Sequence, residues 1–158
     1  MQLEHFFPYR LAVAAENFSR ALAQVYGAAH GLSRDEWRIL AALDQAGRVS
    51  SVDIARRTTL DKVQVCRAAA RMEEKGLISR DTSDADRRLR EFALTPAGAA
   101  LFARAFPQVQ ARADQMLADF TPAERQILDR ALLTLAAQIP PDQGQDQDPP
   151  ENPEHDAC

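Results

Sequence analysis

Residues Ser79–Gly98, SRDTSDADRRLREFALTPAG, place a long polar turn between two short segments of alternating apolar and polar character. The two segments, LISRD (77–81) and REFAL (90–94), have the pattern of paired strands and predict a β-hairpin. In this turn and directly after it, three arginines lie next to two aspartates: Arg87, Arg88, Arg90, Asp84 and Asp86. A hairpin does not need so long or so charged a turn. The turn is therefore either a solvated connection or a contact for something negatively charged.

Capping residues on both sides of the hairpin mark helix starts. SRDE (33–36) is a capping box that opens a helix ending near Gly47. Further helices are predicted to begin at Ser50, Asp61, Thr95 and Thr121, the last two with proline at the first helical position. A first helix over residues 8–29 is indicated by one apolar stripe: Leu11, Ala15, Phe18, Leu22, Val25 and Ala29.

The order of these elements predicts the fold class. One long helix is followed by three shorter helices, the hairpin and two closing helices. We expect a mainly α protein with a small β-hairpin, in which a winged helix-turn-helix lies between N- and C-terminal helices. The predicted units are the N-terminal helix (1–30), the winged helix-turn-helix lobe (31–95), the C-terminal helices (96–139) and a tail (140–158).

Charge is distributed unevenly along the 158 residues. The stretch 139–158 holds six acids and no Lys or Arg, whereas residues 48–90 hold 11 Lys or Arg against 7 Asp or Glu. The tail has too few apolar residues to offset its ordering entropy, so we expect it to be disordered. The sequence lacks a membrane span and a signal peptide, and two cysteines cannot form a disulfide framework, so we expect a cytoplasmic protein.

The helix that begins at Asp61 is predicted to recognise DNA. Val65, Ala69 and Met72 form its inward side, whereas its polar side carries Lys62, Gln64, Arg67 and Arg71. In a helix-turn-helix the N-terminal part of this helix enters the major groove, where an amide suits adenine and a guanidinium suits guanine or phosphate. A solvated charged face is the alternative, but the arginine-rich hairpin that follows favours DNA.

The arginine turn then has a function as a wing. Its tip can follow the phosphates into the adjacent minor groove, where the field favours guanidinium groups. Asp86 is close enough in sequence to pair with Arg88 and fix its direction. The wing candidates for DNA contact are Asp86, Arg87, Arg88 and Arg90.

Three segments resemble the multiple-antibiotic-resistance regulator (MarR) family. DRRLREFALTPAG (86–98) is similar to the family's wing, DKVQVCRAAARMEEKGLI (61–78) to its recognition helix and following strand, and LSRDEWRILAAL (32–43) to its second helix. The resemblance covers about residues 8–139. It implies an obligate homodimer joined through the first, fifth and sixth helices, palindromic double-stranded DNA as partner, and relief of repression by a small ligand.

The resemblance also implies a ligand site in the cleft between the dimer helices and the DNA-binding lobe. The candidate residues near that cleft are Tyr9, Arg10, Tyr26, His30, Trp37 and Arg38. FFPYRLAV (6–13) and EWRIL (36–40) resemble members that sense aromatic acids or their coenzyme A thioesters, and an arginine beside an apolar slot suits an anionic group. Alternatively, Trp37 belongs to the core, and Arg10 and Arg38 form salt bridges at the dimer surface.

Other function classes have less support in the sequence. It contains no nucleophile with a base, no paired carboxylates and no phosphate-binding glycine loop, so we expect no enzyme and no cofactor. Three scattered histidines and no CxxC predict no metal site. A winged helix used for protein contact would need an apolar recognition face. Cys66, where the family often has Ser or Thr, is either a small packed side chain or a redox sensor.

Overall fold

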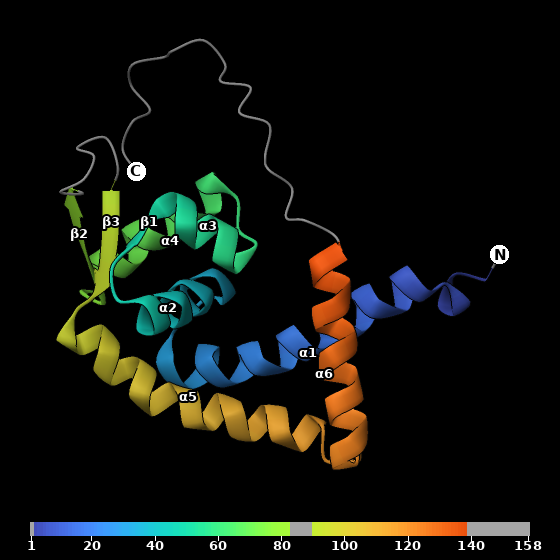
Figure 1. The fold of residues 1–158 in the computed structure, drawn as a ribbon. Coiled ribbons are helices and arrows are strands. Elements are labelled where there is room, and N and C mark those ends of the chain that lie inside the picture. Colours follow the sequence, from blue (N-terminus) through green and yellow to red (C-terminus); the bar gives the residue numbers. More distant parts are fainter. Residues whose placement is uncertain (1, 83–89, 139–158) are drawn as a thin grey trace, which may run out of the picture.

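The computed structural model describes residues 2–82 and 90–138 (Figure 1). It confirms the predicted class, a mainly helical fold with a small antiparallel sheet. The elements are, in chain order, a 3₁₀ turn (Leu3–His5), α1 (Phe7–His30), α2 (Arg34–Ala46), β1 (Val49–Ser50), α3 (Ser51–Thr58), α4 (Lys62–Glu74), β2 (Ile78–Thr82), β3 (Arg90–Leu94), α5 (Pro96–Met116) and α6 (Pro122–Gln138).

The capping residues predicted from the sequence start these helices. Ser33 accepts a hydrogen bond from the Glu36 amide at 3.2 Å, and Glu36 accepts one from the Ser33 amide at 2.7 Å, which completes the capping box of α2. Thr95 accepts from the Gly98 amide at the start of α5. These bonds satisfy N–H groups that a helix leaves without internal partners.

The sheet has one strand that the sequence pattern did not reveal. Its order is β1-β3-β2, all antiparallel, with Val49 opposite Phe92 and Ile78 opposite Leu94. β1 has only two residues, too few to produce a visible alternation. It joins the link between α2 and α3 to the hairpin, so the wing is attached to the helix-turn-helix by backbone hydrogen bonds.

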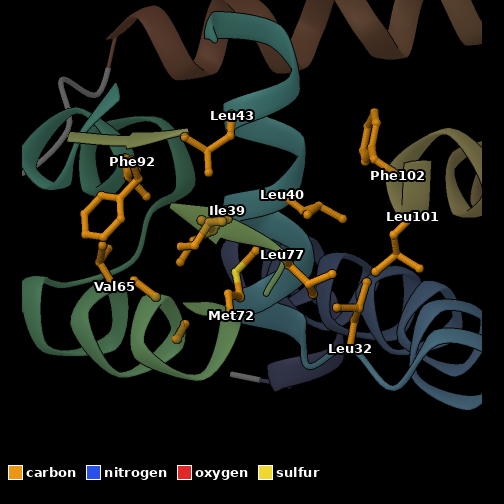
Figure 2. Close-up of a cluster of buried hydrophobic side chains, with 14 of the residues drawn as sticks. Leu32, Ile39, Leu40, Leu43, Val65, Met72, Leu77, Phe92, Leu101 and Phe102 are labelled. Atoms are coloured by element: carbon orange, nitrogen blue, oxygen red, sulfur yellow. The ribbon is translucent and has the colours of Figure 1, made fainter. Parts of the chain in front are cut away.

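Figure 2 shows the core between α2, α4 and the sheet. Ile39 and Leu40 of α2, Val65 and Met72 of α4, and Phe92 of β3 are fully buried, and the inward side predicted for α4 is confirmed. Burying each such side chain stabilises the folded state by about 1.5–3 kcal/mol relative to leaving it exposed. This core fixes α4 against α2 and leaves the opposite face of α4 in solvent.

The N- and C-terminal helices lie outside this lobe. In Figure 1, α1 and α5 run side by side, and α6 rises steeply from the end of α5. Much of their apolar surface is uncovered in the single chain; the exposed apolar side chains include Phe7, Val13, Phe106, Ile127, Leu128, Leu132 and Leu133. Among the described residues, no helix combines the length and the apolarity needed to cross a membrane.

Gly98 allows α5 to approach the start of β2 closely. A Cβ at this position would lie 2.0 Å from the Leu77 carbonyl oxygen, which is backbone and cannot rotate away. We expect Gly98→Ala to lower the free energy of unfolding by about 1–3 kcal/mol, the usual cost of overpacking. Urea denaturation followed by circular dichroism measures this change.

The control for Gly98→Ala is Gly27→Ala in α1, where the added Cβ would meet the Leu32 carbonyl oxygen at an ordinary 3.6 Å. Alanine is the better helix former, so this variant is expected to gain roughly 0.5–1 kcal/mol. Equal denaturation midpoints for the two variants would contradict the close approach at Gly98.

Candidate nucleic-acid interface and adjoining cavities

The N-terminal half of α4 presents its polar side chains to solvent. Lys62, Gln64 and Arg67 are all exposed, while Val65 beneath them is fully buried. The Gln64 amide oxygen accepts a hydrogen bond from the Asp61 amide at 2.9 Å, as part of the capping box of α4. Gln64 would therefore have to leave the cap before it could bind adenine through both its oxygen and its nitrogen.

Arg71 differs from the other three polar residues of α4. It lies in the last turn, and its Nε is 3.5 Å from Oε1 of the buried Glu36 on α2. Oε1 of Glu36 also accepts a hydrogen bond from Lys75 at 2.8 Å. Arg71 thus faces the body of the lobe as well as solvent, whereas Lys62 and Arg67 form no ion pair within the described part of the chain.

The wing is described only at its base. Asp86, Arg87 and Arg88 lie outside the described residues, so the pairing of Asp86 with Arg88 stays a prediction. Arg90 is exposed and is the first residue of β3, opposite Thr82.

Ion pairs hold the base of the wing. Arg48, just before β1, lies 2.9 Å from Asp81 of β2, and Arg80 of β2 pairs with Glu73 of α4. Neither arginine was predicted as a wing support, because their partners become neighbours only when the sheet forms.

A row of aromatic rings connects α1, α2 and α5. Trp37 stacks on Tyr26 with ring centroids 5.1 Å apart and on Phe102 at 5.4 Å, and Phe102 contacts Phe106 at 5.3 Å. Burial raises the pKa of the Tyr26 hydroxyl above its usual value. Trp37, in the middle of the row, is partly buried and packs against the core. The choice between a core residue and a ligand residue stays a prediction.

Two cavities adjoin Trp37 and Arg38. The first, of about 600 Å³, lies between α1, the start of α2, and α6. Its lining is mainly apolar and comprises Leu11, Ala14, Ala15, Phe18, Ser19, Leu22, Tyr26, Arg34, Trp37, Arg38, Leu117, Arg125, Leu128, Asp129 and Leu132. The second, of about 500 Å³, lies between α2 and the end of α3 and is lined by Trp37, Arg38, Ala41, Ala42, Gln45, Arg57, Thr58 and Thr59.

Half of the predicted ligand residues lie together at these cavities. Tyr26, Trp37 and Arg38 line the first cavity. Tyr9 and Arg10 lie in the exposed first turns of α1, and His30 ends that helix; these three line neither cavity.

Arg34 lines the first cavity and was not among the predicted ligand residues. It is the first residue of α2, and its guanidinium donates two hydrogen bonds, at 3.0 and 3.1 Å, to the two carboxylate oxygens of Glu16 on α1. These bonds hold the pKa of Glu16 below its usual value. Arg34 and Glu16 are 18 residues apart, and no local pattern joins them.

Cys66 is partly buried on α4, beside the exposed Arg67. The choice between a packed side chain and a redox sensor stays a prediction. The part of the chain that the structure describes contains no cluster of three or more side chains suited to a metal ion.

The fold and the exposed α4 place the chain in the class of winged-helix transcriptional regulators. The model of the MarR family matches residues 30–89. The homoprotocatechuate degradative operon repressor of Escherichia coli is 31% identical over 103 residues, which are 65% of this chain and 70% of the repressor. The chain belongs to the MarR family.

Solved structures agree with this family membership. A MarR/EmrR family regulator from Acinetobacter sp. ADP1 superposes with a TM-score of 0.79 at 26% identity, covering 87% of this chain and 97% of the other. A MarR family regulator from Streptomyces coelicolor, solved in complex with DNA, has a TM-score of 0.81 at 19% identity, covering 92% and 93%; this likeness concerns the fold.

Proposed function

We propose that two copies of this chain bind a palindromic operator and repress transcription until a small aromatic acid, or its coenzyme A thioester, releases them. The protein acts in the cytoplasm by binding and carries out no reaction. The observation that carries the effector proposal is the stacked pair Tyr26–Trp37 at the wall of a 600 Å³ cavity that also contains Arg34 and Arg38.

The proposal of a homodimer is supported by the uncovered apolar surface of the terminal helices. Leu128 and Leu132 of α6 are 40% and 45% exposed, and they line the first cavity together with Phe18 and Leu22 of α1. Contiguous apolar surface of this kind marks an association site. A second copy is the occupant that would give the pair two recognition helices, and twofold symmetry requires a palindromic site.

The proposal of DNA contacts is supported by the position of α4. Its N-terminal half is exposed, and its apolar side holds it rigidly on α2. Lys62 and Arg67 are then available to phosphates or bases, with Arg87, Arg88 and Arg90 of the wing as further contacts. A winged helix used for protein contact would need an apolar recognition face instead, and Val63 is the one exposed large apolar side chain of α4.

The lining of the first cavity suits an aromatic acid. Tyr26 and Trp37 contribute aromatic atoms to this lining, and Arg34 and Arg38 contribute guanidinium groups suited to a carboxylate. The volume falls within the range of about 300–1,000 Å³ usual for small-molecule sites. A 31% identical relative is named for the repression of homoprotocatechuate degradation, which agrees with an aromatic acid as the chemical class.

The Glu16–Arg34 ion pair allows the proposed binding of an aromatic acid at Arg34 to be tested. An incoming carboxylate has to replace Glu16 on Arg34, so Glu16→Gln is expected to tighten binding of a carboxylate probe such as phenylacetate, by up to about fivefold for an exposed pair. Arg34→Gln should weaken it. Isothermal titration calorimetry measures both.

The matched ligand control is phenylacetamide, which has the same ring and no charge; its affinity should be the same in all three proteins. Weaker phenylacetate binding by Glu16→Gln would refute competition for Arg34. Fluorescence anisotropy on the DNA upstream of the protein's own gene then compares release by the free acid with release by its coenzyme A thioester.

A further inference from the structure

Glu36 carries a buried negative charge next to the first cavity. Its side chain is 2% exposed, although burying a carboxylate is costly unless its oxygens are bonded to donors. Both oxygens are bonded. Oε1 accepts from Lys75 at 2.8 Å and lies 3.5 Å from Arg71 Nε, and Oε2 accepts from the Ser33 amide at 2.7 Å and from Lys75 at 2.9 Å.

Helix capping alone does not account for this arrangement. The chain uses the same capping box twice more, with Gln64 at the start of α4 and Glu124 at the start of α6. Both of those side chains are exposed, and Glu124 forms no ion pair within residues 2–82 and 90–138. Glu36 alone of the three lies in the interior and is bonded to a different helix.

The cations that reach Glu36 come from the C-terminal end of the recognition helix. Arg71 is in the last turn of α4 and Lys75 is its C-cap residue. The Lys75 ammonium also donates to the Gly31 carbonyl oxygen at 3.0 Å, so it bonds to the corner between α1 and α2 as well. One end of α4 is therefore fastened to the α1–α2 corner, while its other end is exposed.

The same corner forms a wall of both cavities. Trp37 follows Glu36 directly, lines the two cavities and stacks on Tyr26 of α1. Glu36 and Trp37 are consecutive residues at the start of α2, so a ligand that shifts this turn at Trp37 also shifts the Glu36 carboxylate. Burial raises the pKa of Glu36, but hydrogen bonds from Lys75 and Ser33 outweigh burial and keep the pKa below its usual value. The carboxylate is charged at neutral pH.

We propose that Glu36 is a positioning residue that sets α4 against the α1–α2 corner and couples the effector cavity at Trp37 to the recognition helix. The coupling part rests on the proposed function. A residue that acts this way changes the ratio of operator affinities with and without the effector. A residue that only stabilises the fold changes the free energy of unfolding and leaves this ratio unchanged.

The test uses Glu36→Gln, which keeps the size of the side chain and its capping role and removes the charge. The ratio of operator dissociation constants with and without phenylacetate is expected to fall by about two- to thirtyfold, the range for residues that modulate coupling. Ser33→Ala is the control: it removes the hydroxyl that caps α2 and leaves the Lys75–Glu36 bonds in place. Its ratio should equal that of the wild type.

Lys75→Gln, a substitution of a 41% exposed side chain, keeps the test valid should Glu36→Gln fail to fold. It should lower the ratio as well. The double variant should lower the ratio no further, because both substitutions break the same contact between Glu36 and Lys75. A wild-type ratio in either single variant overturns the coupling.

The DNA-free part of the test separates this proposal from the proposed function. Amide hydrogen exchange in the last turn of α4 should be faster in Glu36→Gln than in the wild type and unchanged in Ser33→Ala. Unchanged exchange in Glu36→Gln overturns the positioning role whatever the DNA results. If no aromatic acid releases the wild type from DNA, the effector part of the proposed function has failed and the coupling with it, while faster exchange still establishes the positioning role.

Discussion

Replacing Leu128 by Glu is expected to produce a monomer whose affinity for the operator is at least about a hundredfold below that of the wild type. Leu128 is 40% exposed on α6 and lines the first cavity. A charge at this position would be buried unpaired if a second copy packed there, and burying an unpaired charge is costly. A monomer loses the second half-site, which otherwise gives an avidity gain of about 10²–10⁴.

Sedimentation velocity at micromolar concentration should show twice the chain mass for the wild type and one chain mass for Leu128→Glu. Gln126→Glu adds the same charge to an exposed polar position on α6 and should stay a dimer. A dimeric Leu128→Glu, or a wild type that is monomeric at this concentration, would contradict the interface. In the dimer the two recognition helices should lie about 34–36 Å apart, one turn of DNA.

The features that the sequence predicted correctly are local ones. The capping box at Ser33 and the helix starts at Asp61 and Thr95 depend on residues close in sequence, so they can be recognised without knowing the fold. The buried side of α4, formed by Val65, Ala69 and Met72, follows from helical spacing alone. The hairpin strands follow from alternation, and the order of these elements was enough to predict the class.

The features that the sequence did not predict depend on distant partners. Glu36 and Lys75 are 39 residues apart, and Arg34 and Glu16 are 18 apart, so neither pair can be found before the helices are placed. β1 was missed because two residues carry no periodicity. The polar side of α4 was predicted as one uniform set, yet Arg71 faces Glu36 and the Gln64 oxygen belongs to a cap.

The candidate ligand residues show the same difference between local features and features that depend on packing. Trp37 and Arg38 were chosen for their chemistry, and α2 brings both to the cavities. Tyr9 and Arg10 have the same chemistry, but they lie in the first turns of α1, whereas the lining of the first cavity on α1 begins at Leu11. Residue type therefore identified suitable groups, and only the packing of α1 on α2 could select among them.

Arg67 and Arg71 of α4 differ in their contacts, and this difference gives the second large expected effect. Arg67→Ala should weaken operator binding by about 1–3 kcal/mol if its guanidinium binds a base or a phosphate, and removal of one phosphate contact should reduce the salt slope by about one. Arg67 is exposed and lies one turn before Arg71 on the same polar side. Arg71→Ala removes the same charge from the same helix, so the two variants are matched in net charge and in helix propensity.

The two variants are expected to differ in the salt slope. The Arg71 guanidinium is held 3.5 Å from the Glu36 carboxylate, so a loss of Arg71 should weaken binding by disturbing the position of α4 and should leave the number of phosphate contacts unchanged. Anisotropy titrations over a range of salt concentrations separate the two cases. Equal reductions of the slope would mean that Arg71 leaves Glu36 for a phosphate when DNA binds. In that case the DNA itself, rather than the α1–α2 corner, would hold the C-terminal end of the recognition helix in the complex.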